Sequence, residues 1–287
     1  MAHDAKPRVS LRALFHFIAA QWRPDARIAI GIAGAMTLAT LTEIFIPVQA
    51  GRLIDALTQG EAGRGAALNA FLIMAALGGT MVVLRHFAWW GVVPFSTRLM
   101  RRVVDNGFAH VQRLSSDWHA NAFSGSVVRK ITRGMWAFDT LDDVILLALV
   151  PSLTILIGSV TLMALKAPLL GLVMAIGAIA YIALTVTLAT RWIAPASRLS
   201  NGWDTKIGGV LADAVGANAV VKAFAGEARE DARLSATTRR WQGRTQRTWM
   251  RHTWAGSGQL ALLWAIRLLV TGMAVWLWWQ GRASAGD

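Results

Sequence analysis

The chain has 287 residues, 55% of them hydrophobic, and a formal net charge of +13 at pH 7. Its apolar residues form runs too long and too uniform for the core helices of one or two soluble domains, which excludes an ordinary soluble fold. The sequence contains no cysteine, which excludes disulfides and cysteine-ligated metal sites.

Five apolar stretches follow one another along the chain. A helix needs about 20 residues to cross the ~30 Å hydrocarbon core of a bilayer, and each stretch is about that long or longer. The predicted spans are residues 27–50, 67–94, 144–165, 168–192 and 253–279. Several tryptophans lie near the ends of these runs, where indole rings favour the headgroup layer. We therefore predict an all-α, polytopic helical membrane protein.

The segment before the first span, residues 1–26, is predicted to form a cytosolic helix that lies at the membrane interface. Its apolar residues fall on one helical face. They are Leu11, Leu14, Phe15, Ile18 and Trp22. The segment lacks the apolar core and small-residue cleavage site of a signal peptide. Residues 27–287 are then predicted to form the transmembrane domain.

The distribution of charge predicts the orientation in the membrane. Lys and Arg concentrate before the first span and in the long connections after the second and fourth spans. The loop 51–66 and the turn at Lys166 carry few. By the positive-inside rule, the N-terminus and both long connections lie in the cytoplasm, and a bacterial inner membrane is expected. A nucleic-acid binder would instead carry this charge on a soluble surface.

Both long connections carry helical stripes of apolar residues. The first follows Met100, Val104 and Phe108, and no proline interrupts the chain between Phe95 and Pro151. The second membrane helix is therefore predicted to continue for nearly 50 residues, or ~75 Å, so that more than half of it extends into the cytosol.

Four segments carry recognisable motifs: Ile46–Leu57 (IPVQAGRLIDAL), Phe123–Arg133 (FSGSVVRKITR), Val220–Glu227 (VVKAFAGE) and Gly281–Asp287 (GRASAGD). They resemble segments of the membrane domain of exporter-type ABC transporters. No single motif is specific, but the four occur in the family's order over the whole chain. The resemblance implies five helices of a six-helix bundle. The sequence departs from the family at Gly134–Trp136, where a polar or acidic residue is usual.

No phosphate-binding Gly-x-x-x-x-Gly-Lys-Ser/Thr loop and no Ser-Gly-Gly-Gln signature is present. The chain itself is therefore predicted to be no enzyme and to hold no cofactor, and it is expected to be a fragment that stops before a sixth helix. The resemblance implies that ATP and Mg²⁺ bind to nucleotide-binding domains, on the same full-length polypeptide or on a separate chain. It also implies a second transmembrane domain, in a homo- or heterodimer, surrounded by membrane lipid.

Four polar residues lie within the predicted spans and are candidates for a substrate cavity: Glu43, Arg85, Gln259 and Arg267. A charge at this depth is costly and should face protein or water. Each also has a structural alternative. Glu43 could pair with Arg267 or Arg85, Arg85 could extend to the headgroups, Gln259 could bond a neighbouring helix, and Arg267 could pair with a missing helix or a second subunit. Asp142 and Asp143, before the third span, are interpreted as a solvated helix end.

Two cytosolic bends are candidates for coupling to the ATPase domains, as the resemblance implies. The residues are Phe123, Ser124, Gly125 and Val128 at the first, and Trp203, Ile207 and Leu211 at the second. Without the resemblance, both would be interpreted as ordinary solvated turns.

The sequence thus predicts the permease part of an ATP-driven exporter that works by alternating access. The alternative is an ATP-independent secondary transporter or channel, whose broken helices and inverted repeat are not visible in the sequence. The residues do not indicate the substrate.

Overall fold

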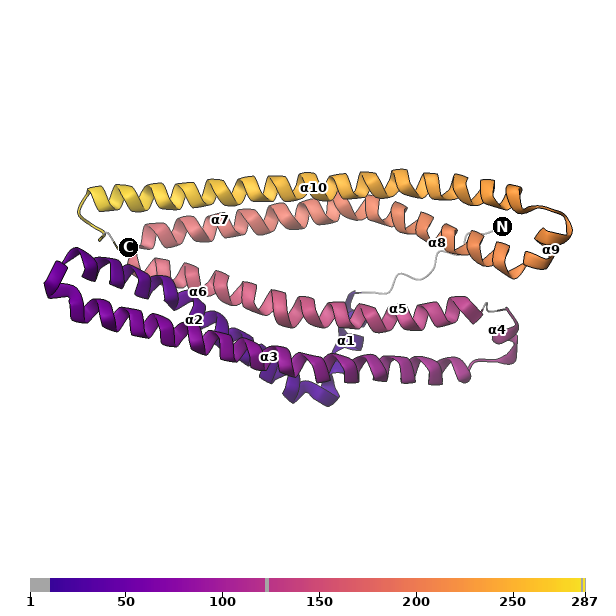
Figure 1. Ribbon diagram of the computed structural model, residues 1–287, viewed down its shortest axis with the longest axis horizontal. Helices are drawn as coiled ribbons and strands as arrows, with labels where there is room; N and C mark the ends of the chain where they lie inside the picture. The colour runs from indigo at the N-terminus through magenta and orange to yellow at the C-terminus, as the bar shows by residue number, and fades with distance from the viewer. Residues whose placement is uncertain (1–10, 122–123, 285, 287) are drawn as a thin grey trace. The chain divides into compact units, whose positions relative to one another are not determined.

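The computed structural model describes residues 11–121, 124–284 and 286. Over these residues the chain is helical and has no β-strand, which confirms the all-α prediction (Figure 1). The helices form two compact units. The first comprises the chain up to Leu162 together with the C-terminal segment from Gly281, and the second comprises Met163–Gln280.

The first unit contains the first two predicted spans and nearly all of the third. Its elements are α1 (Leu11–Trp22), η1 (Arg23–Asp25), α2 (Ala26–Thr58), η2 (Gly60–Gly63), α3 (Arg64–Gln112), α4 (Ser116–Asn121), α5 (Ser124–Asp142), η3 (Asp143–Leu149) and most of α6 (Val150–Lys166). Its core lies between α2, α3 and η3. The buried core residues are Ala29, Ile32, Met36, Ala88, Val92, Phe95 and Leu146. Alanines at this interface let the helix backbones approach closely, as is usual in membrane bundles.

The second unit contains the last two spans. Its elements are α7 (Pro168–Thr187), η4 (Leu188–Ile193), α8 (Ala194–Gly216), α9 (Asn218–Ala223) and α10 (Glu227–Trp279). The Ser200 and Thr245 hydroxyls lie 2.8 Å apart and join α8 to α10. Gly177 on α7 faces Ile266 of α10, and a Cβ at this position would lie 3.0 Å from the Ile266 side chain. The glycine therefore permits the close approach of these two helices.

Two π-helical segments interrupt the long membrane helices, and each precedes a proline. The segment η3 ends at Leu149, two residues before Pro151, and η4 ends at Ile193, two residues before Pro195. Proline lacks an N–H and its ring collides with the carbonyl one turn earlier, so the wider π turn lets the helix continue past it.

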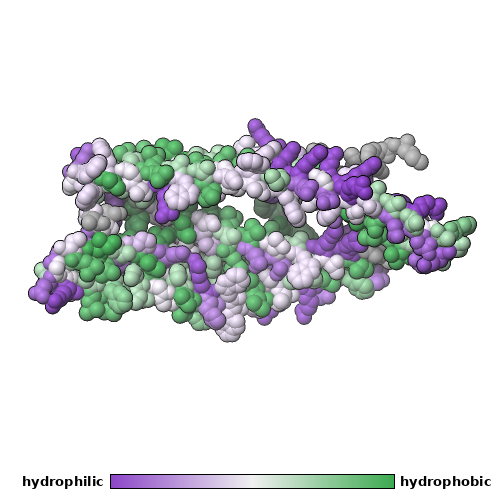
Figure 2. Space-filling view, turned by 45° about the horizontal axis from the view of Figure 1, so that its top comes forward, coloured by the Kyte–Doolittle hydropathy of each residue, from purple (hydrophilic) through white to green (hydrophobic). Residues whose placement is uncertain are grey.

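The predicted extension of the membrane helices beyond the bilayer is confirmed. Helix α3 has 49 residues and α10 has 53, which at 1.5 Å per residue makes them about 74 and 80 Å long. Five helical stretches are long and apolar enough to cross a membrane, and each contains one predicted span. Figure 2 shows the C-terminal half of α10 as hydrophobic and its N-terminal half as hydrophilic.

Candidate functional site

A charged pair joins α2 and α3 within the membrane-spanning region. The Arg85 guanidinium donates to the Glu43 carboxylate, and the two side chains are 41% and 40% exposed. Glu43 therefore pairs with Arg85, which is one of the two structural partners that the sequence suggested. Arg85 turns toward α2, where the Glu43 carboxylate offers an opposite charge at a depth at which an unpaired charge is costly.

The polar residues of the fourth and fifth spans lie in the second unit. Gln259 on α10 donates a 2.9 Å hydrogen bond to Thr185 Oγ1 on α7, as expected for a helix-bonding role. Arg267 is exposed, and its guanidinium lies 5.3 Å from the centre of the Trp264 ring one turn earlier. Among the described residues, no carboxylate forms an ion pair with Arg267. Its charge therefore remains available to a group outside this unit.

The first of the two predicted cytosolic tips contains a short helix that sequence reasoning missed. Between the end of α3 and the start of α5 lies α4, and the Ser115 hydroxyl accepts a hydrogen bond from the Trp118 backbone N–H at its start. The Ser115-Ser116-Asp117 sequence was the available signal, since such residues favour helix starts. Phe123 lies outside the described residues, Ser124 and Gly125 begin α5, and Val128 is exposed.

At the second predicted cytosolic tip, the end of the helical pair is formed by α9 and the turns on either side of it. Ala225, between α9 and α10, has φ +45°, a left-handed conformation that costs a non-glycine residue about 1–2 kcal/mol. Lys222 spans this turn to the Glu227 carboxylate at 2.8 Å and lowers the pKa of Glu227. Next to it, Phe224 is 78% exposed. The turn therefore projects an aromatic side chain from the tip.

The prediction of a bend around Trp203–Leu211 is wrong. These residues lie inside α8, which continues as an unbroken helix to Gly216. Trp203 is therefore about 20 Å from the end of the helix, and its ring packs under Lys206 Nζ at 4.0 Å and near the Arg240 guanidinium at 5.6 Å. Ile207 is half-buried, and only Leu211 is well exposed. The residues that sequence reasoning missed at this tip are Val215, Val220 and Phe224.

Asp142 is not part of a solvated helix end. It is fully buried, and its carboxylate accepts hydrogen bonds from Trp22 Nε1 at 3.0 Å and from Ser96 Oγ at 3.3 Å. The Trp22 ring also meets Phe95 edge-on, with centroids 5.5 Å apart. Sequence reasoning missed this cluster, because its three polar partners come from three separate segments. The carboxylate holds the end of α1 against the bundle.

Burial raises the pKa of Asp142 to about 6, although the two hydrogen bonds act in the opposite direction. A folded-state pKa above the unfolded value means that the buried carboxylate weakens folding as the pH rises from about 4 through 6. We therefore expect Asp142→Asn to have the melting temperature of the wild type near pH 4 and a higher one at pH 7.5. Thermal unfolding in detergent across this range measures the difference. A melting-temperature difference that is independent of pH would contradict it.

A family model described as the ABC transporter transmembrane region matches residues 30–287. The chain belongs to this family. It is an integral membrane domain of the ABC exporter type, which confirms the resemblance and favours it over a secondary transporter or channel.

Two relatives and one solved structure show how much of a transporter this domain represents. It is 25% identical over 252 residues to the Xenopus tropicalis protein named ATP-binding cassette sub-family B member 6, covering 84% of this chain and 28% of that protein. It is 27% identical over 291 residues to the ATM1-type heavy metal exporter of Novosphingobium aromaticivorans. That match covers 96% of this chain and 46% of the exporter. A bacterial Atm1-family ABC exporter with ATP bound has a similar fold, with a TM-score of 0.78, 22% identity, and coverage of 91% of this chain and 47% of that one.

This transmembrane domain therefore spans less than half the length of these relatives. Near its end, the segment after α10 packs on α2. Asp55 accepts hydrogen bonds from Ser284 Oγ and the Gly286 backbone N–H, both at 2.8 Å. A Cβ at Gly51 would collide with the Gly286 carbonyl. The absence of a side chain at Gly51 lets the segment cross α2 here.

Proposed function

We propose that this domain is the substrate-moving part of an ATP-driven exporter that carries its substrate outward by alternating access. The main observation that supports this proposal concerns two short helices, α4 and α9. Each lies at the end of a helix that is much longer than a bilayer is thick: α4 follows α3, and α9 precedes α10. Nucleotide-binding domains would bind ATP and Mg²⁺ beneath these tips, and a second transmembrane domain would complete the pathway. The N-terminus and both tips would lie on the cytoplasmic side of the inner membrane.

The tips are suited to docking. Phe224, Val220 and Leu211 near α9, and Val128 near α4, are apolar and exposed. Exposed apolar side chains on a cytosolic tip are costly unless a partner covers them, and aromatic residues commonly anchor such contacts. Phe123, Ser124 and Gly125 belong to the first docking segment in this proposal, whereas Trp203 and Ile207 lie too far along α8 to take part.

The polar residues in the spans have different roles in the proposed pathway. Arg267, exposed and without a carboxylate partner among the described residues, is the strongest candidate for contact with the substrate. Glu43 and Arg85 neutralise each other, and Gln259 bonds α7. Glu43, Arg85 and Gln259 therefore mainly hold neighbouring helices together. A substrate would contact them only at the exposed part of each side chain.

Nucleotide-dependent motion of the two units tests this function. Nitroxide labels at Thr132→Cys on α5 and Thr205→Cys on α8, both exposed, report the separation of the cytosolic halves in the complete transporter. We expect ATP with vanadate to shift the distance distribution to shorter values, because alternating access closes the cytosolic side.

The control is a label pair within one unit, Asp105→Cys and Thr132→Cys, whose distance should stay constant. The absence of native cysteine in this chain simplifies both experiments. If the α5–α8 distribution is the same with and without trapped nucleotide while ATP turnover is intact, the proposed function is wrong.

A further inference from the structure

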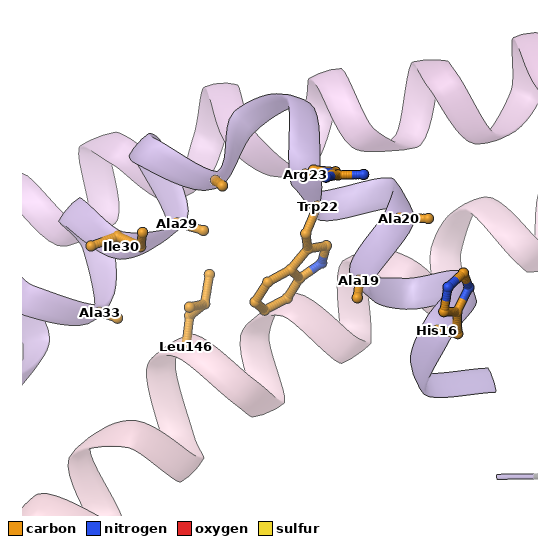
Figure 3. Close-up of a pocket in the computed structure, with 10 residues that line it drawn as sticks. His16, Ala19, Ala20, Trp22, Arg23, Ala29, Ile30, Ala33 and Leu146 are labelled. Carbon is orange, nitrogen blue, oxygen red and sulfur yellow. The ribbon is translucent and has the colours of Figure 1, made fainter. Parts of the chain in front are cut away.

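An apolar groove of about 570 Å³ lies where α1 meets the beginning of α2 (Figure 3). Its lining is dominated by alanines, among them Ala19 on α1 and Ala29 and Ala33 on α2, and Leu146 closes one side. Figure 3 shows Ala29, Ala33 and Leu146 around one space, which the Trp22 ring borders. Because alanine side chains are short, they leave room there that longer aliphatic residues would fill.

The groove is held in shape by polar contacts behind its wall. Trp22, which lines it, is hydrogen-bonded to Asp142. One turn away, Arg102 forms an ion pair with Asp25 and donates to the Gln21 carbonyl at 3.1 Å. These contacts fix the angle between α1 and α2, so the groove exists before any ligand enters it.

Measured against the predicted first span, the groove extends from headgroup depth into the hydrocarbon. Arg23 lies four residues before the first predicted span, 27–50, and Ala33 lies six residues inside it, or ~9 Å deeper along the helix. Arg23 lines the groove and is exposed. It takes part in no ion pair found among the described residues, since the neighbouring Asp25 is occupied by Arg98 and Arg102. The rim therefore carries an uncompensated positive charge.

We propose that this groove binds an anionic phospholipid, with one acyl chain along Ala29 and Ala33 and the phosphate at Arg23. An alanine-lined groove at hydrocarbon depth matches an acyl chain, and a guanidinium binds a phosphate through charge-assisted hydrogen bonds. Basic groups beside membrane helices attract anionic lipid by about 1 kcal/mol each. None of the residues that line the groove is among the candidates for substrate contact or for nucleotide coupling.

Native mass spectrometry of the detergent-purified protein tests the site. The probes are dioleoyl phosphatidylglycerol and dioleoyl phosphatidylcholine, which share acyl chains and differ in headgroup charge. We expect the wild type to retain the anionic lipid preferentially. Arg23→Gln should reduce that preference about fivefold, the equivalent of about 1 kcal/mol. Ala33→Phe should reduce retention of both lipids, because the ring occupies the chain's place.

Ala180→Phe, at an exposed position on α7, and Arg239→Gln, on α10, are the matched controls and should behave as the wild type. Unchanged preference in Arg23→Gln, or unchanged retention in Ala33→Phe, would overturn the proposal. Glycerophosphoglycerol, the headgroup without chains, should not displace the lipid. Displacement by it at equal concentration would show a plain anion site and would equally overturn the proposal.

Discussion

Phe224→Asp is expected to uncouple ATP turnover from transport in the complete transporter while leaving membrane insertion intact. Phe224 is 78% exposed at the tip beside α9, outside every predicted span. If it anchors a nucleotide-binding domain, a carboxylate there would be desolvated in an apolar contact. Loss of such an anchor costs about 2 kcal/mol or more, or roughly a 30-fold loss of docking.

The measurement is the number of substrate molecules moved per ATP hydrolysed in proteoliposomes. Phe224→Leu keeps an apolar anchor and should retain most of the coupling. Ser235→Asp places the same charge on an exposed position of α10, 11 residues further along the chain, and should have no effect. Normal transport per ATP in Phe224→Asp would make the tip an ordinary solvated turn.

Arg85→Met is expected to destabilise the protein strongly. It leaves the Glu43 carboxylate without its partner at a depth where a charge is costly. Removing one member of a buried ion pair costs about 3–5 kcal/mol of folding stability. Because the Glu43 and Arg85 side chains are partly exposed, we expect a cost near the lower end of that range. The double variant Glu43→Gln with Arg85→Met should recover much of the lost stability, because neither side then carries an unpaired charge.

Thermal unfolding in detergent of the two single variants and the double variant measures the coupling between the two residues. A matched control is available in Arg64 and Glu61, which form a 2.7 Å ion pair with side chains 78% and 85% exposed. Arg64→Met should change stability little, since exposed pairs contribute about 0–1 kcal/mol. Equal effects of Arg64→Met and Arg85→Met would show that the Glu43–Arg85 pair is solvated like a surface pair.

The features that the sequence predicted correctly are local or compositional. The five spans follow from the length of the apolar runs, and the extension of α3 to Gln112 follows from an apolar stripe without an interrupting proline. Both depend on residues a few positions apart, which is the range over which helix periodicity acts. The family resemblance rested on short motifs in a fixed order, which the match over residues 30–287 bore out.

The features that only the tertiary structure decided join distant parts of the chain. Glu43 and Arg85 are 42 residues apart, and Trp22 and Asp142 are 120 apart. From sequence alone, Glu43 had two candidate partners, Arg85 and Arg267, whereas Asp142 was interpreted as solvated because its neighbours are polar. The second tip was misplaced for a related reason. No sequence pattern marks either the end of α8 at Gly216 or the left-handed Ala225 between α9 and α10, and these two backbone features decide where the tip lies. Periodicity shows which face of a helix is apolar, whereas the partner of a polar side chain is decided by packing.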